Sequence, residues 1–325
     1  IIITGAAGFI GFHYAQALCA QGHSVLGLDN LNDYYDGELK EDRLKILSAL
    51  GNFEFRKVDL DDRETLDIIF GDWKPQVVVN LAAQAGVRYS LDNPRAYVDS
   101  NLVGFANILE GCRNNDVEHL IFASSSSVYG ANEKVPFSVE DRVDHPVSLY
   151  AATKRANEMM AHAYAHLYRL PVTGLRFFTV YGPWGRPDMA YYKFTKAIYE
   201  GQPIDIVEAM VRLASKPAKA DPAWKAHNPN PSTSNAPYRL YNIGNNNPEK
   251  LMDMISILED AIGIEAKKSF LPMQPGDVCA TFADTQALED EIGFKPSTSL
   301  KDGLGKFVNW YMDYNGIADS SLKQA

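Results

Sequence analysis

A tyrosine and a lysine four positions apart offer the most distinctive chemistry in the sequence. The stretch SLYAATKRANE carries Tyr150 and Lys154 in an alanine-rich segment that should be helical. Positions four apart on a helix share one face, so the ammonium group can lie beside the phenol. A tyrosine acts as a general base or acid when a nearby positive charge stabilises its phenolate. The same spacing also arises on many helix surfaces, so the assignment depends on what the chain places beside the pair.

A glycine-rich turn near the start of the chain indicates a second chemical site. In IIITGAAGFIG, Gly5, Gly8 and Gly11 follow an expected strand and open an expected helix. Asp29 closes the next expected strand, 18 residues after Gly11. In this layout the glycine backbone and a helix N-terminus hold a pyrophosphate, while the carboxylate binds ribose hydroxyls. Because an acid there repels a 2′-phosphate, the pattern predicts NAD rather than NADP.

Two later strand ends carry residues that would face the same ligand. Asp59 can contact the adenine part of the cofactor or cap the next helix, and the sequence does not separate the two. Ala82 and Ala83 leave room for a ligand, although helix–sheet packing also selects small residues. The predicted cofactor contacts extend to neighbouring residues and to one helical asparagine: Phe9, Ile10, Asn30, Leu60, Leu81 and Asn101.

Four serines, Ser124 to Ser127, end the fifth expected strand in IFASSSSVYG. In an open α/β sheet the carboxyl ends of the strands face the ligand crevice. Hydroxyl groups there can hydrogen-bond a substrate hydroxyl or carbonyl, but serine also favours the start of loops. Ser125, Ser126 and Ser127 are therefore candidate substrate contacts.

The elements that must position these residues alternate between strand and helix. Strands are expected at residues 1–4, 24–29, 53–59, 76–82, 119–125 and 171–178, and helices at 9–21, 38–49, 62–70, 95–114 and 148–169. This alternation predicts an α/β fold with a Rossmann-type, doubly wound parallel sheet and helices on both faces. The near-continuous apolar strands agree, since parallel strands are buried on both sides.

The rhythm changes after about residue 182. Helices are expected at 189–200 and 248–262, short strands near 238–243 and 266–270, and an exposed, proline-rich loop at 216–237. We therefore expect an NAD-binding Rossmann domain over residues 1–182. A smaller mixed α/β substrate lobe should occupy mainly residues 183–325, partly interleaved with the first domain.

One junction in this second half does not fit the pattern. GQPIDI reads as a strand and VEAMVRLASK as a helix, yet they meet at Ile206 and Val207 without a turn. Strand-to-helix connections typically take ~2–6 residues, so we expect residues to be missing there. One continuous helix is the alternative, although Pro203 would lie near its start.

The composition of the 325-residue chain narrows its class. With 46% apolar and 22% charged residues it is typical of a soluble globular protein. A net charge of −10 without a basic run disfavours nucleic acid and anionic membranes as partners, but leaves an anionic small substrate open. No apolar run approaches the ~20 residues of a membrane span.

The cysteines and the ends of the chain bear on its location. Cys19, Cys112 and Cys279 are odd in number, far apart and set in apolar surroundings, so we expect buried thiols. Reduced thiols and the lack of a visible signal peptide predict a cytoplasmic location. Ile1 stands inside an expected strand, which leaves a preceding segment open. We expect no metal site.

The glycine turn, the serine strand end and the Tyr-x-x-x-Lys pair together resemble the extended short-chain dehydrogenase/reductase superfamily. Within it the chain is similar to the NAD-dependent epimerase/dehydratase family, and most closely to the UDP-glucuronate 4-epimerases. The similar segments follow one another over nearly the whole chain: TGAAGFIGFH, LDNLNDYYD, NLAAQAGVRYS, ASSSSVYG, RFFTVYGP, RPDMAYYKFTKAI, YNIGNNNP and MQPGDV. An ordered set of this kind is more specific than any one motif.

The resemblance implies a reaction and roles for the residues. Tyr150 would be the general base and acid, Lys154 would stabilise its phenolate, and Ser125 would hydrogen-bond the sugar 4-hydroxyl. UDP-glucuronate and UDP-galacturonate would interconvert through a transient 4-keto sugar with tightly bound NAD. Related folds also imply a homodimer through the helices expected near 95–114 and 148–169.

The segment TVYGPWGRPDMA bears on the substrate. Thr179 and Arg186 stand where they could bind the sugar carboxylate, Arg186 as a bidentate partner. Without the resemblance, a surface ion pair for Arg186 and strand packing for Thr179 would be the preferred interpretation. Arg88 and Lys193 are candidates for the diphosphate, with a solvated surface position as the alternative.

The chain also departs from the family pattern. An Arg-Asp-Phe-type motif expected between PIDI and VEAMV is absent, at the junction described above, and Cys279 stands where a proline is expected. If that segment is deleted, UDP-sugar binding is in doubt.

Several rival functions remain open at this point. A sugar 4,6-dehydratase needs an acidic pair where Ser126 and Ser127 stand, and a neutral-sugar epimerase acting on UDP-glucose or UDP-N-acetylglucosamine would not need Arg186. Only Thr179 and Arg186 argue against a UDP-glucuronate decarboxylase. A catalytically silent NAD-sensing protein would be expected to lack the tyrosine or the lysine.

Overall fold

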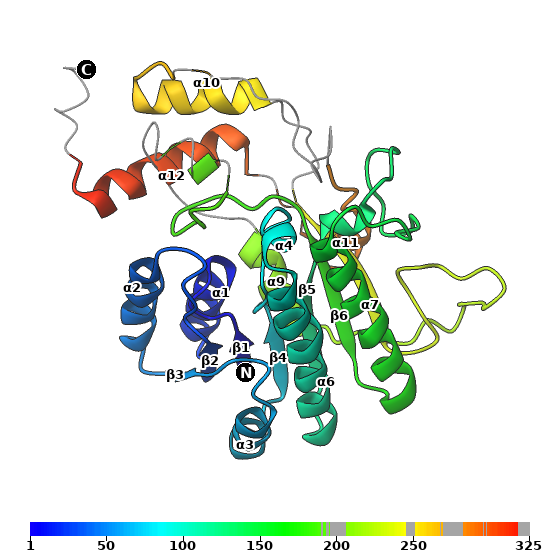
Figure 1. Ribbon diagram of the computed structural model, residues 1–325. Helices are drawn as coiled ribbons and strands as arrows, with labels where there is room; N and C mark the ends of the chain where they lie inside the picture. The colour runs from blue at the N-terminus through cyan, green and yellow to red at the C-terminus, as the bar shows by residue number, and fades with distance from the viewer. Residues whose placement is uncertain are drawn as a thin grey trace.

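A seven-stranded parallel sheet forms the centre of the protein in the computed structural model (Figure 1). The structure describes residues 1–189, 191–192, 195, 206–244, 251–266, 268, 282–294, 296 and 298–317. The strands are β1 (Ile2–Thr4), β2 (Val25–Asp29), β3 (Phe53–Lys57), β4 (Val77–Asn80), β5 (His119–Ser125), β6 (Val172–Phe177) and β7 (Tyr238–Ile243). Their spatial order, β3-β2-β1-β4-β5-β6-β7, reverses direction between β1 and β4. The predicted doubly wound α/β fold is thus confirmed.

Helices cover both faces of the sheet, which explains why the strands are apolar throughout. One face packs against α1 (Phe9–Ala20), α2 (Gly37–Ser48), α9 (Ile206–Ala214) and α11 (Gln286–Ile292). The other packs against α3 (Arg63–Trp73), α6 (Gly104–Asn114) and α7 (Leu149–Tyr168). Every residue of β2 and β6 is buried, as expected for parallel strands between two helical layers.

The helix expected over residues 95–114 is divided into three parts. After the short α4 (Tyr89–Asp92), α5 (Pro94–Val98) leads into a π-helical turn, η1 (Asp99–Val103), and then into α6. Such turns are rare and often occur at functional sites. This turn carries the buried Asn101.

One prediction for the second half of the chain was wrong, and another holds for only part of its stretch. The strand near 238–243 is β7 of the main sheet and pairs with β6, whereas we expected it in the smaller lobe. An apolar strand pattern does not say which neighbour the strand pairs with. The proline-rich stretch 216–237 is an irregular loop without buried residues up to residue 231, as expected, but its end is buried. There Ser234 is fully buried, and its carbonyl oxygen accepts a hydrogen bond from the backbone nitrogen of Asp221 at 2.7 Å.

The junction at Ile206 lies at the edge of the described residues. Ile206 is the first residue of α9, so it belongs to the helix and not to a strand as expected. Residues 201–205, most of the strand expected near 266–270, and Cys279 lie outside the described residues.

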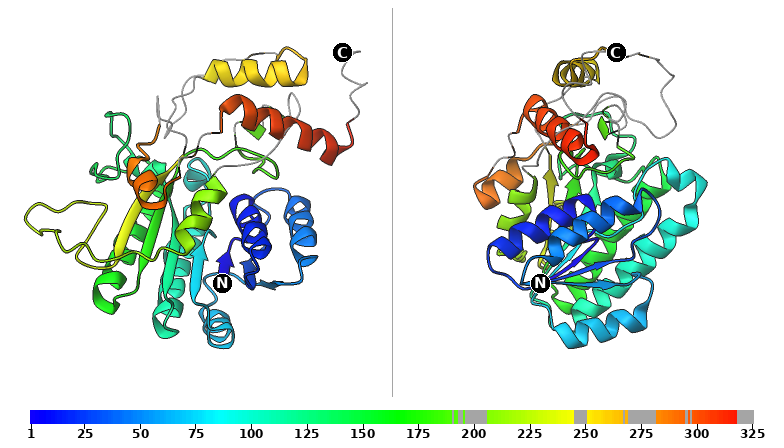
Figure 2. Two further views of the ribbon diagram at one scale, coloured as in Figure 1. Left: turned by 180° about the vertical axis from the view of Figure 1, so that it is seen from behind. Right: turned by 90° about the vertical axis from the view of Figure 1, so that its left-hand side faces the viewer.

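A second apolar core lies beyond the carboxyl ends of the strands. There α10 (Leu251–Ile262) and α12 (Leu300–Asn315) lie side by side (Figures 1 and 2). Leu258, Leu304, Phe307 and Trp310 are among the buried residues of this core. Within the described part of the chain, none of the helices has the length and apolar character to cross a membrane.

Candidate active site

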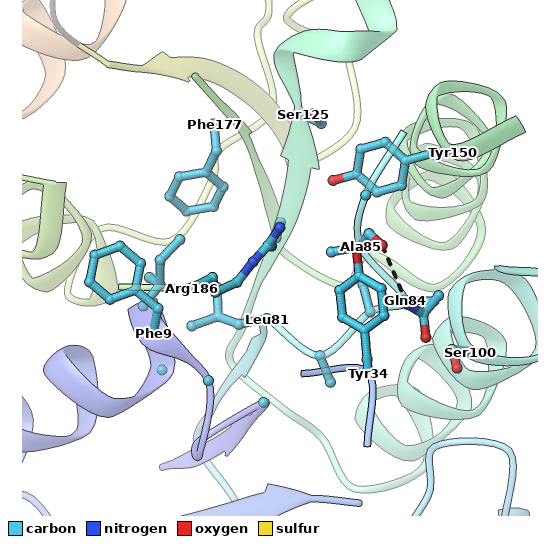
Figure 3. Close-up of a pocket in the computed structure, with 18 of the residues that line it drawn as sticks. Phe9, Tyr34, Leu81, Gln84, Ala85, Ser100, Ser125, Tyr150, Phe177 and Arg186 are labelled. Atoms are coloured by element: carbon cyan, nitrogen blue, oxygen red, sulfur yellow. Dashed lines mark hydrogen bonds between the residues drawn. The ribbon is translucent and has the colours of Figure 1, made fainter. Parts of the chain in front are cut away.

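A cavity of about 730 Å³ opens at the carboxyl ends of the strands, where the strand order reverses (Figure 3). This is where open α/β sheets bind their ligands. The predicted site residues on its wall are Gly5, Gly8, Phe9, Ile10, Gly11, Asp29, Asn30, Asp59, Leu60, Leu81, Ala82, Ala83, Arg88, Ser125, Ser126, Ser127, Tyr150, Lys154, Thr179 and Arg186. Lys193 lies outside the described residues.

The glycine turn leaves a backbone cradle at the start of α1. Gly5 has a φ of 70°, and a Cβ there would lie 2.8 Å from the backbone nitrogen of Ala82. A Cβ at Gly11 would overlap the carbonyl oxygen of Gly5. Helix α1 begins after Gly8 without a side-chain cap from the described residues. Its first N–H groups therefore remain able to bind an anion.

Asp29 is held at the end of β2 by backbone groups. Its carboxylate accepts hydrogen bonds from the backbone nitrogens of Ala7 at 3.2 Å and Leu31 at 2.9 Å. Each carboxylate oxygen has room for a further hydrogen bond, and the side chain is on the cavity wall. This is the arrangement needed to bind ribose hydroxyls.

Asp59 is not a helix cap, which was the alternative interpretation of this residue. Asp62 caps α3 instead, accepting from the backbone nitrogen of Thr65 at 3.1 Å. Asp59 accepts a hydrogen bond from the side chain of Asn30 at 2.8 Å, and both line the cavity.

Asn101 lies behind the wall and not on it. Its side-chain oxygen accepts from the backbone nitrogen of Gln84 at 2.8 Å, and its amide donates to the carbonyl of Gln84 at 3.1 Å. The same amide donates to the hydroxyl of Thr153 on α7 at 3.1 Å. Asn101 therefore fixes the loop after β4 against α7, while its neighbour Ser100 lines the cavity.

The Tyr150–Lys154 pair occupies the first turns of α7. Ser148 caps this helix, accepting from the backbone nitrogen of Ala151 at 3.1 Å. The hydroxyl of Tyr150 points into the cavity (Figure 3). Lys154 is buried on the same helix face, and its Nζ donates to the carbonyl oxygen of Ala123 on β5 at 2.9 Å.

Burial shifts the pKa values of both residues toward their neutral forms. It raises the pKa of Tyr150, which the nearby hydroxyl of Ser125 and the charge of Arg186 only partly offset. Burial lowers the pKa of Lys154 to about 8. A positive charge from a ligand in the cavity would lower the raised pKa of Tyr150 and favour the phenolate.

The serines at the end of β5 have different partners. Ser125 accepts from the backbone nitrogen of Ser127 and donates to its hydroxyl, both at 3.2 Å. Ser124 donates to Glu158 at 2.7 Å. Ser126 begins the 3-10 helix η2 (Ser126–Tyr129).

Arg186 brings a positive charge into the cavity. In Figure 3 its guanidinium lies between Phe9 and Phe177 on one side and Tyr150 on the other. Its Nε and Nη2 donate to the carboxylate of Asp188 at 3.0 and 2.8 Å. The surface ion pair considered for Arg186 is thus an ion pair inside the cavity.

The wall residues that were missed from the sequence include three with polar side chains that bear on the chemistry of the site. Tyr34, Lys40 and Asp188 all line the cavity. Lys40 donates to the carbonyl oxygen of Asn32 at 2.7 Å, and burial lowers its pKa. The position of Asp188, two residues after Arg186, could have indicated an ion pair between them. Nothing in the helix expected over residues 38–49 distinguished Lys40 from a surface lysine.

Comparison with known proteins identifies the family. Residues 1–219 match the sequence model of the NAD dependent epimerase/dehydratase family. The chain belongs to this family. It is 56% identical to Protein CapI of Staphylococcus aureus (97% of this chain, 98% of that protein) and 49% identical to the Probable UDP-glucuronate 4-epimerase of Rhizobium meliloti (95% and 96%).

Solved structures of the same family have the same fold. The UDP-glucuronic acid 4-epimerase from Bacillus cereus, in complex with UDP-glucuronic acid and NAD, superposes with a TM-score of 0.83 at 30% identity. The match covers 96% of this chain and 99% of that one.

The residues of this chain fit the family's cofactor, NAD. The turn at α1 requires glycine at position 5, because a Cβ there would clash with the backbone of Ala82, and Asp29 lies at the end of the adjacent strand. The free N–H groups suit a pyrophosphate, and the carboxylate suits an unphosphorylated ribose.

Proposed function

We propose that the protein is a UDP-glucuronate 4-epimerase, which interconverts UDP-glucuronate and UDP-galacturonate. The observation that carries the proposal is the presence of Tyr150, Ser125 and Arg186 in one cavity. The first two can exchange a proton with a sugar hydroxyl, and the third can bind a carboxylate. The relatives named UDP-glucuronate 4-epimerase support the same substrate.

The residues divide the chemistry between them. When bound, NAD accepts a hydride from carbon 4 of the sugar and returns it to the opposite face, with no net redox change. Tyr150 takes the proton of the 4-hydroxyl and later returns it. Lys154 stabilises the phenolate, and Ser125 hydrogen-bonds the 4-oxygen during the transfer.

Arg186 and Thr179 hold the sugar carboxylate. The transient 4-keto uronic acid is a β-keto acid, which can lose carbon dioxide when the bond to the carboxylate aligns with the ketone π system. Holding the carboxylate out of that alignment retains it. Both residues line the cavity, as this role requires.

The remaining substrate contacts come from the smaller lobe and the loop after β4. We place this lobe mainly in residues 183–325, partly interleaved with the Rossmann domain of residues 1–182. The apolar core of the lobe includes Phe307 and Trp310. Arg88, on the cavity wall, contacts the diphosphate. Lys193 is the second residue proposed for this role, and it lies outside the described residues.

The protein acts as a homodimer in the cytoplasm. Large apolar side chains are exposed on α5, η1 and α7, among them Val98, Val103 and Met159. A second copy would cover them. Cys19 and Cys112 are buried free thiols, as expected in a reducing compartment.

Incubation with UDP-glucuronate, followed by proton NMR, tests the proposed reaction. UDP-galacturonate should form without release of carbon dioxide, and Tyr150→Phe should slow its formation by about 10²–10⁴-fold. Formation of a UDP-pentose would instead indicate a decarboxylase. Turnover of UDP-glucose or UDP-N-acetylglucosamine alone would overturn the uronic acid assignment.

A further inference from the structure

Asp188 occupies the Nε/Nη2 edge of Arg186, one of the two edges through which a guanidinium can bind a carboxylate. The Nε and Nη2 groups of Arg186 each donate to one oxygen of Asp188, at 3.0 and 2.8 Å. Tyr34 adds a hydrogen bond from its hydroxyl to Oδ2 of Asp188 at 3.2 Å. All three residues line the cavity, so the ion pair lies where a substrate would lie.

Both members of the pair are charged at neutral pH. Burial alone would raise the pKa of Asp188, but the hydrogen bonds and charge of Arg186 outweigh it and hold the pKa below its ordinary value. The pKa of Arg186 is raised, because Asp188 outweighs the effect of burial. The pair is therefore neutral as a unit, and it offers an entering carboxylate little net attraction.

A carboxylate substrate that binds at this edge must compete with a carboxylate of the protein. The bidentate edge suits a sugar carboxylate only after Asp188 has released it. A neutral sugar, whose carbon 6 carries a hydroxyl, makes no such demand. Asp188 therefore lowers the affinity for a uronic acid more than the affinity for a neutral sugar. Specificity is this difference between the two affinities.

We propose that Asp188 is a specificity-determining residue, an internal counter-ion that holds Arg186 and limits how strongly the site prefers uronic acids over neutral sugars. The inference rests on the proposed function in taking Arg186 as the partner of the sugar carboxylate. Tyr34 keeps Asp188 in place through its hydrogen bond. In this account the carboxylate of Asp188 is exchanged for that of the substrate during each binding event.

The variant Asp188→Asn tests the proposal because it removes the charge and keeps an oxygen that can accept from Arg186. Dissociation constants for UDP-glucuronate, UDP-glucose and UDP would be measured by calorimetry on the NAD-loaded protein. Affinity for UDP-glucuronate should rise about tenfold, the effect of one partly screened charge at close range. Affinities for UDP-glucose and UDP should stay within about twofold.

Two matched variants complete the experiment. Asp260→Asn removes one charge from an exposed position on α10 and should change none of the three affinities. Tyr34→Phe removes the hydrogen bond to Asp188 without changing charge, and should shift the preference in the same direction by less.

The outcomes separate this inference from the proposed function. If Asp188→Asn weakens all three ligands equally, Asp188 only supports the loop, and the proposal is overturned. An unchanged ratio of the UDP-glucose and UDP-glucuronate affinities overturns it as well. Turnover of UDP-glucuronate, followed in the same samples by NMR, reports separately on the proposed function. A shifted ratio without any epimerisation would support the counter-ion and reject the reaction.

Discussion

Two buried charges lie one turn apart on α7, and their surroundings differ. Lys154 is 3% exposed and donates to one backbone carbonyl, that of Ala123. In the part of the chain that the structure describes, it forms no ion pair with a carboxylate. Glu158 is fully buried and accepts from Arg176 at 2.8 and 3.0 Å, and from Arg155 at 3.0 Å.

The difference indicates a catalytic role for the charge of Lys154 and a structural role for the charge of Glu158. A buried charge without a counter-ion is costly, but its pKa can shift and its field acts on its neighbours. A paired buried charge fixes geometry instead. Glu158 joins α7 to Ser124 on β5 and to Arg176 on β6. It thereby sets where Tyr150 stands relative to Ser125.

The largest effect on catalysis is expected for Tyr150, the member of the Tyr150–Lys154 pair that exchanges a proton with the substrate. Tyr150→Phe removes the hydroxyl that exchanges the proton, so kcat should fall by about 10²–10⁴-fold. The free energy of unfolding and the NAD content should change little, because the ring remains in place. Steady-state kinetics with UDP-glucuronate give the first value, and urea unfolding gives the second. A variant that keeps a third or more of the activity would contradict the role of Tyr150.

Removing the paired charge should act on stability. Glu158→Gln leaves Arg176 buried without its counter-ion and should lower the free energy of unfolding by about 3–5 kcal/mol. Glu64→Gln, on the exposed first turn of α3, should cost less than about 1 kcal/mol and serves as the control. Urea titrations compare them. Equal unfolding free energies of the two variants would show that the ion pair between Glu158 and Arg176 does not stabilise the packing of α7.

Removing the unpaired charge of Lys154 should raise the free energy of unfolding, whereas removing Glu158 lowers it, and the gain should depend on pH. The pKa of Lys154 is about 8 in the folded protein against 10.5 when unperturbed. The unfolded chain binds more protons between these values, so the stability of the wild type rises with pH across that window. Below it, the shift corresponds to about 3 kcal/mol of lost stability.

Lys154→Met should therefore be more stable than the wild type at pH 7, after removal of NAD, and inactive in catalysis. The advantage should shrink as the pH rises from about 8 toward 10. Urea unfolding of both proteins at several pH values measures the difference. An advantage that stays constant with pH would mean that the lysine is not held in the shifted state.

The smallest effects should distinguish two adjacent serines. Ser125→Ala should lower kcat by about 10–100-fold, the loss of one hydrogen bond to a developing charge. Ser124→Ala should cost about 1–2 kcal/mol of unfolding free energy through Glu158, with kcat changed by less than about threefold. Kinetics and urea unfolding on both variants provide the comparison. Equal changes in kcat and in unfolding free energy for the two variants would contradict a catalytic role for Ser125 and a structural role for Ser124.

Local patterns predicted much of this arrangement. The alternating elements and the glycine turn specify the parallel sheet, and strand ends in such a sheet meet at one edge. Residues that end or follow strands were thus located together in advance, Asp29 and Ser125 among them. Their roles stay predictions, since position alone does not establish chemistry.

What the sequence did not reveal depends on distant contacts. The pairing of β7 with β6 and the link from Tyr34 to Asp188 join segments far apart in the chain. Arg186 was expected to meet a ligand or a surface partner, and its internal counter-ion was not foreseen. The break of the helix at Asn101 is a local change in helical hydrogen bonding that apolar periodicity does not record.

The most direct test follows the hydrogen on carbon 4. UDP-glucuronate carrying deuterium at that carbon would be incubated with the protein in ordinary water and the product examined by NMR. The UDP-galacturonate formed should retain the deuterium, because the hydride stays within the site while Tyr150 exchanges only the hydroxyl proton. Product in which hydrogen from water has replaced the deuterium would contradict it.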